Sequence, residues 1–411
     1  MEMMKRRSCR PLRRRAVIAT GCVSLQLLLA ACAGPVPTHS RDAHVRESAE
    51  PASAPYAPAE HDAVDTITSI WQLSSGSVKV VLCEPQRAGA SPLVIYLPGL
   101  GEPSEAGERW RVAWAAAGYA VLSVQALVED STAWTSELAR AGDFKSLGRW
   151  RYAPAAMSRR VAALAEVLTQ AQHRAAAGDR GWQHIDWNRV VVAGFDLGAY
   201  TAMAMAGERV AGAGAMEQAG GLTIRAAVAF SPYASPSADA LDTRYLGIRI
   251  PVLSVTSDRD GDPLGLADGA SLRSAPFDHM TGPDKYLLSL QGLHHAQLSG
   301  SALAAPQPPS AGNRSDAASN KSGGSGQRSR GGRRQTASET GGSADREERG
   351  AGSAGDDGGL SAPDLQMRMR AAQDITTAFL DAHVKDDPRA RSWLAAGASQ
   401  WLGASGELRR K

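Results

Sequence analysis

RVVVAGFDLGAYTAMA, at residues 189–204, is a strongly apolar run that passes through two glycines into a helical run of small residues. Gly194 and Gly198 lie two positions before and after Asp196. A strand that leads directly into a helix makes a crowded turn, and glycine relieves the crowding at these positions. The spacing predicts an elbow whose apex side chain, Asp196, projects above the carboxyl end of the strand. The alternative is that Asp196 only caps the helix by accepting backbone N–H bonds.

On both sides of this elbow, apolar runs of strand length alternate with helical runs from about residue 65 to residue 300. Such alternation is typical of an α/β fold with a mostly parallel sheet covered by helices on both faces. We expect strands at about residues 77–82, 93–97, 120–124, 189–193, 226–230, 252–256 and 286–290. We expect helices at about residues 106–117, 155–174 and 199–206.

The chain is predicted to fold as one domain in two pieces, residues 65–303 and 362–411. An α/β domain of roughly 250 residues with tails accounts for most of the length. Residues 304–361 are rich in Gly, Ser, Arg and Asp with almost no bulky apolar side chain, so we expect a disordered insertion. Beyond it, Pro363 is placed to start a helix with an apolar stripe that returns to the sheet.

The N-terminus has the pattern of an export signal, residues 1–31, in which a basic cluster precedes an apolar run from Ala16 to Ala31. The run ends in Leu29-Ala30-Ala31-Cys32, which resembles the bacterial lipobox and implies that Cys32 is acylated and anchors the protein to a membrane. An ordinary secretory signal with a chance cysteine is the alternative. Residues 32–64 are rich in Pro, Ala and charge, and are expected to form a flexible tether.

The residues around the signal bear on localisation. Ala33, rather than aspartate, follows the cysteine, which implies sorting to the outer membrane of a Gram-negative envelope, facing the periplasm. Arg14-Arg15 resembles a twin-arginine signal, although basic pairs are common in such regions, so the sequence does not choose between the Sec and Tat export routes.

Composition excludes several other classes of protein. The formal charge is only +3 and is partly carried by the N-terminal basic cluster, so no nucleic-acid partner is expected. Cys83 is the only cysteine in the predicted domain, which excludes an internal disulfide and favours a small buried core residue. No cofactor motif is present, and the adjacent His294 and His295 lack a third partner that would make a metal site. The sequence gives no indication of a protein partner.

A second element of chemistry precedes the elbow. Residues 92–101, PLVIYLPGLG, form a strand-like run followed by a glycine loop. A loop at this point can present a backbone N–H group to a developing oxyanion, and Leu100 is the predicted donor beside the N–H group of Leu197. The alternative is a simple strand-to-helix turn.

An acid and a histidine follow the elbow in chain order. The strand-like run 251–257 ends in Asp258, Asp260 and Asp262, and the run 286–290 leads to His294 and His295. A buried acid orients a catalytic histidine and stabilises its cationic form. Asp260 is the preferred acid, and Asp258 and Asp262 remain alternatives because loop aspartates often only form turns.

Three segments together carry a family resemblance: residues 194–202, GFDLGAYTA, residues 260–263, DGDP, and residues 295–300, HAQLSG. They resemble the elbow, acid loop and histidine loop of the dienelactone hydrolase-like branch of the α/β-hydrolase superfamily, which includes bacterial relatives of platelet-activating factor acetylhydrolase. The resemblance spans about residues 93–300 plus the terminal helix. It implies an α/β-hydrolase fold and a triad of Asp196, Asp260 and His295, and it favours His295 over His294. In that branch a serine or cysteine occupies the position of Asp196.

An aspartate at the apex changes the expected chemistry. A carboxylate is ionised at neutral pH, but its attack on an ester gives a strained mixed anhydride. Its attack on a saturated carbon bearing a halide or an epoxide oxygen gives an ordinary ester, which His295 and water would then hydrolyse. This is similar to haloalkane dehalogenases and epoxide hydrolases, although Leu197 stands where those commonly carry Trp, and too few residues separate Tyr233 from Pro251 for their helical cap.

The expected function is therefore hydrolysis of a small ester, lactone or alkyl substrate. The alternative is a catalytically inactive descendant that serves as a binding or envelope lipoprotein, because a fold does not dictate a function. Trp134, Trp150 and Tyr152 precede the helix at 155–174 and are expected either to cover the site or only to pack.

Overall fold

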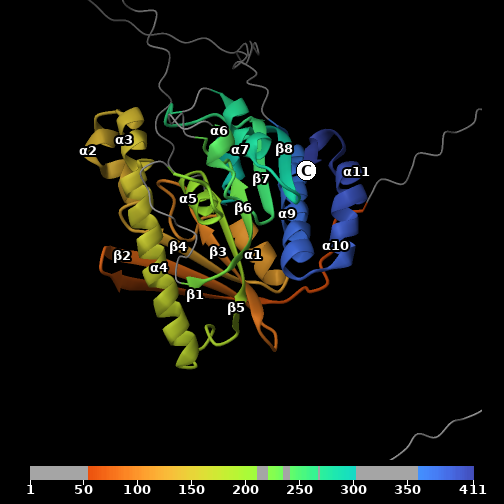
Figure 1. Ribbon diagram of the computed structural model, residues 1–411, viewed down its shortest axis with the longest axis horizontal. Helices are drawn as coiled ribbons and strands as arrows, with labels where there is room; N and C mark the ends of the chain where they lie inside the picture. Colours follow the sequence, from red (N-terminus) through yellow and green to blue (C-terminus); the bar gives the residue numbers. More distant parts are fainter. Residues whose placement is uncertain (1–53, 211–220, 235–240, 267–268, 302–359) are drawn as a thin grey trace, which may run out of the picture. The chain divides into compact units, whose positions relative to one another are not determined.

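The computed structural model describes residues 54–210, 221–234, 241–266, 269–301 and 360–411. Within these residues the strands form a nine-stranded sheet in the order β1-β2-β4-β3-β5-β6-β7-β8-β9 (Figure 1). Pairs among β3 to β8 are parallel, whereas β1, β2 and β9 pair antiparallel with their neighbours. The sheet is thus mixed and largely parallel, which confirms the predicted α/β class.

The strands are β1 (Val64–Leu73), β2 (Gly76–Pro85), β3 (Ser91–Leu97), β4 (Ala120–Ala126), β5 (Ile185–Phe195), β6 (Ile224–Phe230), β7 (Val252–Arg259), β8 (Lys285–His294) and β9 (Gly406–Arg410). The main helices are α1 (Glu108–Ala116), α3 (Phe144–Arg151), α4 (Pro154–Ala176), α5 (Leu197–Met205) and α9 (Ala362–Val384). Shorter helical segments are η1 (Ser131–Thr135), α2 (Glu137–Arg140), α6 (Leu241–Arg244), η3 (Ala270–Arg273), α7 (Ala275–His279), α8 (His295–Leu298), α10 (Pro388–Ser392), η4 (Trp393–Gly397), α11 (Ala398–Leu402) and η5 (Gly403–Ser405).

Each predicted strand lies inside an observed one, but the edge strands β1 and β9 were not predicted. The β9 sequence, GELRR, has no apolar alternation. Its backbone pairs with β8 along the register from Leu290 to Tyr286, so backbone hydrogen bonds rather than side-chain burial define it.

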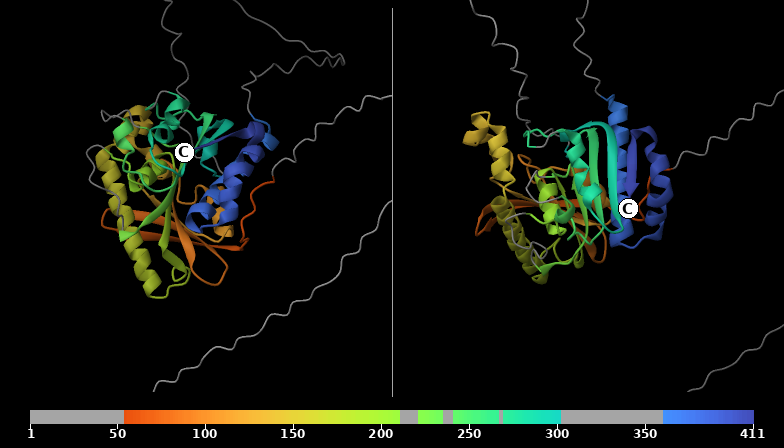
Figure 2. Two further views of the ribbon diagram at one scale, coloured as in Figure 1. Left: turned by 45° about the vertical axis from the view of Figure 1, so that its right-hand side comes forward. Right: turned by 45° about the horizontal axis from the view of Figure 1, so that its top comes forward.

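The sheet separates two apolar cores, because successive side chains of a strand point to opposite faces. Leu93 and Ile95 of β3 pack in the core that α4 and α5 cover. Val94 and Tyr96 pack in the other core, which α1 and α9 cover. Figure 2 shows α4 and α9 on opposite sides of the sheet.

Helix α9 returns to the sheet as predicted. Phe379 is fully buried, and its ring lies 5.5 Å from that of Tyr286 on β8. Tyr119, which precedes β4, donates a hydrogen bond to Asp381 on the same helix (2.8 Å). The C-terminal segment therefore completes the second core.

Several predictions fall on residues outside this description. The signal peptide 1–31, Cys32, the tether as far as residue 53 and residues 304–359 of the insertion all lie outside the described residues. In the part of the chain that is described, no helix combines the length and the apolar character needed to cross a membrane.

Candidate active site

The predicted elbow is present between β5 and α5. Asp196 stands at its apex with φ 52° and ψ −111°, a conformation that non-glycine residues rarely adopt. A Cβ atom on Gly198 would lie 1.9 Å from the carbonyl oxygen of Leu97, and one on Gly194 would lie 2.4 Å from the carbonyl carbon of Gly198. Both positions therefore require glycine.

The side chain of Asp196 does not cap α5, so the capping alternative is wrong. Its Oδ1 atom instead accepts a hydrogen bond of 2.6 Å from the phenol of Tyr152, which lies between α3 and α4. Asp196 is 5% exposed and Tyr152 is 7% exposed. Burial, followed by the charge of Asp196 and this hydrogen bond, raises the pKa of Tyr152 well above its usual value, so the phenol stays protonated as a donor.

His295 and Asp260 meet as predicted. The Nδ1 atom of His295 lies 2.8 Å from Oδ1 of Asp260, so Nδ1 carries the proton and Nε2 is the proton acceptor. The alternatives lie elsewhere. Asp262 accepts bonds from backbone N–H groups in its own turn, Asp258 accepts one from Gly292, and His294 caps α8.

Asp260 is fully buried and is held by several donors. The hydroxyl of Ser231, at the end of β6, donates to Oδ1 (2.7 Å), and Thr256 on β7 donates to Oδ2 (2.8 Å). Burial raises the pKa of Asp260, but the hydrogen bond from His295 and the charge of Arg273 lower it, and the net shift is downward. The acid is therefore ionised and fit to stabilise a cationic imidazole.

The other ring nitrogen faces the elbow. The Nε2 atom of His295 lies 3.8 Å from Oδ1 of Asp196, too far for a hydrogen bond but within range of a shared water. The ring packs 4.8 Å from that of Phe195, which fixes its plane. The structure thus brings together the three predicted side chains, a carboxylate on each side of one imidazole.

The predicted oxyanion donors lie in two segments: Leu197 follows the apex residue Asp196 at the start of α5, and Leu100 lies in the loop after β3. The N–H groups of Leu100 and Leu197 have no acceptor among the described residues. Neighbouring groups of the loop already form hydrogen bonds. The N–H group of Gly101 donates to the carbonyl of Glu129 (2.8 Å), and the side chain of Gln125 donates to the carbonyl of Gly99 (2.9 Å). These contacts hold the loop, and the N–H groups of Leu100 in the loop and of Leu197 at the start of α5 stay available to a ligand oxygen.

Glu102 is a buried carboxyl group behind this loop. Its Oε2 atom accepts the N–H of Gly99 (2.9 Å), and its Oε1 atom accepts the hydroxyl of Ser301 (3.2 Å). Burial raises the pKa of Glu102 to about 7, against the lowering effect of its hydrogen bonds from Gly99, Ser299 and Ser301. The charge of Asp196 contributes to the increase.

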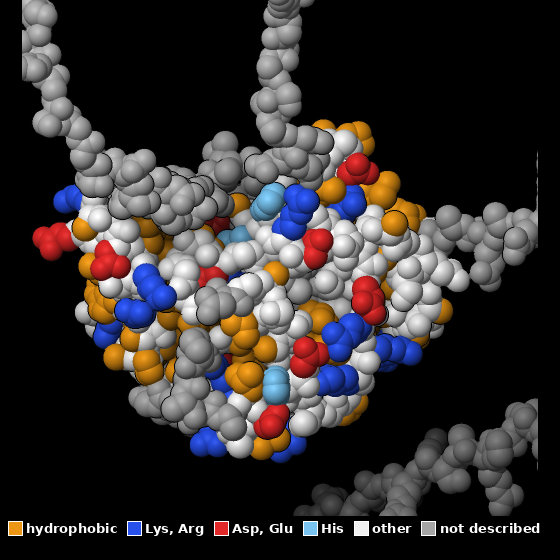
Figure 3. Space-filling view, turned by 90° about the horizontal axis from the view of Figure 1, so that it is seen from above, with side chains coloured by type: hydrophobic (Ala, Val, Ile, Leu, Met, Phe, Trp, Pro, Cys, Tyr) orange, Lys and Arg blue, Asp and Glu red, His pale blue; other side chains and the backbone are white. Residues whose placement is uncertain are grey.

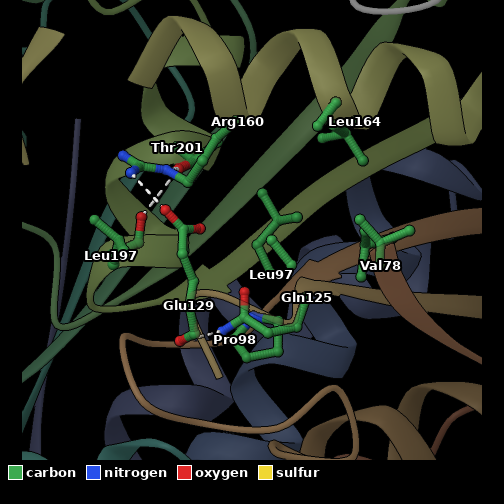
Figure 4. A pocket seen from close by; sticks show the side chains of 13 residues that line it. Val78, Leu97, Pro98, Gln125, Glu129, Arg160, Leu164, Leu197 and Thr201 are labelled. Carbon is green, nitrogen blue, oxygen red and sulfur yellow. Dashed lines mark hydrogen bonds and ion pairs between the residues drawn. The ribbon is translucent and has the colours of Figure 1, made fainter. Parts of the chain in front are cut away.

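Arg160 holds the backbone just before Tyr152 and links it to α5 and to Glu129. Arg160 on α4 donates to the carbonyl of Arg151 (2.8 Å) and to the hydroxyl of Thr201 on α5 (3.1 Å), and forms an ion pair with Glu129 (3.3 Å). Figure 4 shows Arg160, Glu129 and Thr201 in the lining of a cavity of about 50 Å³. The rest of its lining is apolar apart from Gln125 and includes Leu97 and Leu164. The cavity holds a few waters at most and is not lined by Asp196 or His295.

Of the three aromatic residues expected either to cover the site or only to pack, Trp134, Trp150 and Tyr152, one contacts Asp196. Tyr152 contacts Asp196, and its ring packs on those of Tyr200 (5.7 Å) and Tyr233 (4.6 Å). Trp134 packs against Gly101, where an added Cβ would lie 2.0 Å from the indole nitrogen, while Trp150 is 52% exposed. Tyr152 is thus the loop aromatic that reaches the candidate nucleophile.

A wider groove of about 760 Å³ lies between α1 and α9, beside Gln297 and Gly300 of the histidine loop.

Acidic and basic side chains are interspersed on the face that Figure 3 shows. Among the described residues, no group of three or more His, Cys, Asp or Glu side chains is arranged to hold a metal ion.

Sequence reasoning missed the site roles of Ser231 and Arg273 and left Tyr152 open. Ser231 follows a buried strand directly, and the carboxyl ends of parallel strands meet at one edge, so its position was a usable signal. Arg273 lies in η3, far from any motif, and no local pattern distinguishes it from a surface arginine.

No family model matches the chain, and no curated protein matches it either. The fold and the site together define an α/β protein with a carboxylate, an imidazole and a second carboxylate at the carboxyl edge of its sheet.

Proposed function

We propose that this chain is a hydrolase of the α/β-hydrolase fold that uses Asp196 as a nucleophile on a small alkyl substrate, ester or lactone. One observation carries the proposal: the Asp196 carboxylate is held at a strained elbow, makes no capping bond, and lies 3.8 Å from a histidine backed by Asp260. Strained backbone at a turn apex is retained where it positions chemistry. The dienelactone hydrolase-like branch remains the family that the motifs resemble.

Two half-reactions follow from this arrangement. Asp196 attacks a saturated carbon, the new C–O bond forms an ester, and the leaving group departs with the bonding electrons. His295 then takes a proton from water through Nε2, and the hydroxide adds to the ester carbonyl. The N–H groups of Leu100 and Leu197 stabilise the oxyanion. On its collapse the departing alkoxide takes the proton from Nε2 of His295 and leaves as the alcohol, and the carboxyl group of Asp196 loses its proton to solvent.

An alkyl substrate suits the aspartate better than an ester or a lactone. Attack on a carbonyl would form a mixed anhydride, which lies uphill of the ester substrate, whereas alkylation forms an ester of ordinary stability. Asp196 also needs no base for the first step, which agrees with the distance of 3.8 Å between Nε2 of His295 and Oδ1 of Asp196.

The test is to trap the ester. The His295→Gln variant is incubated with short haloalkanes, epoxides, lactones and acyl esters. The peptide that contains Asp196 should gain the mass of the alkyl group from a haloalkane, of the whole molecule from an epoxide or lactone, or of the acyl group from an acyl ester. Asp196→Asn should gain nothing, and the wild type should release the alcohol without accumulating adduct. Absence of an adduct across the panel, in a folded His295→Gln protein, would contradict the proposal.

The second candidate is a binding protein that retains the fold without turnover. The observation that favours it is the hydrogen bond of 2.6 Å between Tyr152 and Oδ1 of Asp196, which occupies one oxygen of the candidate nucleophile in a buried setting. Tyr152→Phe separates the two candidates. It should raise the rate of adduct formation if the phenol only restrains a working nucleophile, and leave a non-catalytic protein without any adduct.

We also propose that the protein is a lipoprotein of the bacterial envelope, anchored through Cys32 at the outer membrane and facing the periplasm. The support is the Leu29-Ala30-Ala31-Cys32 sequence and Ala33 that follows it. Metabolic labelling with a clickable fatty acid should tag the wild type and miss Cys32→Ser, whereas Cys83→Ser should be labelled as the wild type is. Equal labelling of the wild type and Cys32→Ser would refute the anchor.

A further inference from the structure

Arg273 is the buried cation of the candidate site. It lies in η3, is 1% exposed, and its Nε atom is 3.8 Å from Oδ1 of Asp260. Its Nη1 atom donates to the carbonyls of Ser231 (3.2 Å) and Pro232 (3.5 Å). These contacts fix the plane of the guanidinium, because its three nitrogens are rigidly coplanar.

Part of this guanidinium has no acceptor. Among the described residues, neither Nε nor Nη2 of Arg273 has a hydrogen-bond partner, although both atoms are buried. A buried donor without an acceptor costs about 1 to 3 kcal/mol, and native proteins seldom leave such donors unfilled. Burial lowers the pKa of Arg273, but the charges of Asp260 and Asp196 raise it more, so the group remains charged.

We infer that the free edge of Arg273 is a subsite for a small monoanion, either the leaving group of the substrate or an acidic substituent that the substrate carries. Arginine presents its N–H groups in a fork that suits carboxylates and other small anions. The subsite adjoins Asp260, whose Oδ1 atom lies 3.8 Å from Nε of Arg273, and the charge of Asp196 also acts on Arg273.

The charges of the site favour a leaving anion. This step rests on the proposed function. In the resting site Asp196 and Asp260 carry two negative charges against the single positive charge of Arg273. When Asp196 attacks an alkyl halide, the carboxylate becomes a neutral ester and its negative charge appears on the halide. Arg273 keeps its ion pair with Asp260, but the negative charge of Asp196 that also acted on it is gone, and the halide can take its place. An epoxide releases no anion, so a leaving-group role for this subsite would fit an alkyl halide and not an epoxide.

Anion binding can be measured without turnover. The purified full-length chain is titrated with bromide or with formate at constant ionic strength in a gluconate background, and tryptophan fluorescence and the thermal midpoint are followed. Bromide represents a leaving group and formate an acidic substituent. Saturable binding is expected in the wild type, and it should tighten about tenfold in Asp196→Asn, because that variant loses a competing negative charge.

The controls separate the subsite from general charge. Arg273→Gln should lose saturable binding, and Arg140→Gln, an exposed arginine on α2, should bind as the wild type does. Asp196→Asn leaves Arg273 intact, so it remains informative even if Arg273→Gln does not fold. No saturable effect of either anion on folded Asp196→Asn, or equal binding in Arg273→Gln and Arg140→Gln, overturns the inference.

The anion titration and the adduct test can succeed or fail independently of each other. Anion binding that depends on Arg273, combined with no adduct on Asp196, would keep the subsite and refute the hydrolase. An adduct on Asp196 without anion binding would support the hydrolase and refute the subsite. Tight bromide and weak formate binding assign the subsite to the leaving group, and the opposite order assigns it to an acidic substituent.

Discussion

At the scale of single residues, the proposed chemistry depends on the side chain at the apex of the elbow. The imidazole of His295 lies between two carboxylates, with Nδ1 at 2.8 Å from Oδ1 of Asp260 and Nε2 at 3.8 Å from Oδ1 of Asp196. The side chain at position 196 can then be exchanged while the strained backbone beneath it stays the same.

Asp196→Ser is expected to produce a serine nucleophile beside His295. A fluorophosphonate probe should label residue 196 in this variant and leave the wild type unlabelled, as peptide mass spectrometry would show. Labelling should be about 100-fold slower when His295→Gln is added, because the general base is then missing. A folded Asp196→Ser protein that the probe does not label would show that the geometry does not support nucleophilic attack.

The raised pKa of Glu102 makes the free energy of unfolding depend on pH, and its direction determines whether stability rises or falls with pH. Its folded pKa of about 7 exceeds the usual value of a glutamate, so the folded state binds the proton more tightly than the unfolded state. The contribution of Glu102 to stability is present at pH 4 and is lost as the pH rises through 7.

Glu102→Gln should remove this loss. Relative to the wild type, the variant should gain about 1 to 3 kcal/mol in free energy of unfolding between pH 5 and pH 8, measured by urea denaturation. Glu137→Gln, on the exposed side of α2, serves as the control for a surface glutamate. A constant difference between Glu102→Gln and the wild type over this range would contradict the raised pKa.

At the scale of elements, the junction of β5 and α5 depends on backbone contact. Gly198 packs on the carbonyl of Leu97 at the end of β3, so α5 and two neighbouring strands share one crowded point. The same point carries the candidate nucleophile and one of its oxyanion donors. Stability and the candidate chemistry are therefore coupled through this glycine.

Gly198→Ala should be strongly destabilising. The added Cβ would lie 1.9 Å from a backbone oxygen that cannot move without distorting the sheet, so we expect a loss above about 4 kcal/mol or failure to fold. Gly261→Ala is the matched control, because an added Cβ there meets nothing within 4 Å. A thermal midpoint for Gly198→Ala close to that of Gly261→Ala would show that the elbow relaxes easily.

At the scale of the whole molecule, the C-terminal segment belongs to the core although a long stretch of sequence separates it from β8. Arg109 at the start of α1 links the two sides of that stretch. Its backbone N–H donates to the carbonyl of Gly300, and its guanidinium donates to Gln366 on α9. Residues before and after the predicted insertion are thus held by the same helix.

Replacing residues 306–359 with a short Gly-Ser linker should therefore leave folding cooperative. The free energy of unfolding should change by less than about 1 to 2 kcal/mol, because closing a shorter loop costs little. Chemical denaturation of both proteins provides the measurement. A much larger loss, or a second unfolding transition, would mean that the replaced residues contribute to the core.

The sequence by itself determined the α/β class, the positions of the buried strands and the elbow, because these depend on local apolar runs and on glycines at fixed spacing. It also placed Asp260 and His295 in the right loops, since strand ends mark the edge where such groups gather. It did not predict β9, which has no apolar pattern of its own.

Only the tertiary structure decided which groups meet. The contact of Tyr152 with Asp196 joins residues 44 positions apart, and Ser231 and Arg273 reach Asp260 from separate elements. No local pattern encodes such contacts, because they depend on how α3, α4 and η3 pack over the sheet. The tertiary structure also decided that the Asp196 carboxylate contacts Tyr152 and does not cap α5. A helix cap and a candidate nucleophile have the same sequence context, and they differ only in which donor the folded chain brings to the oxygen.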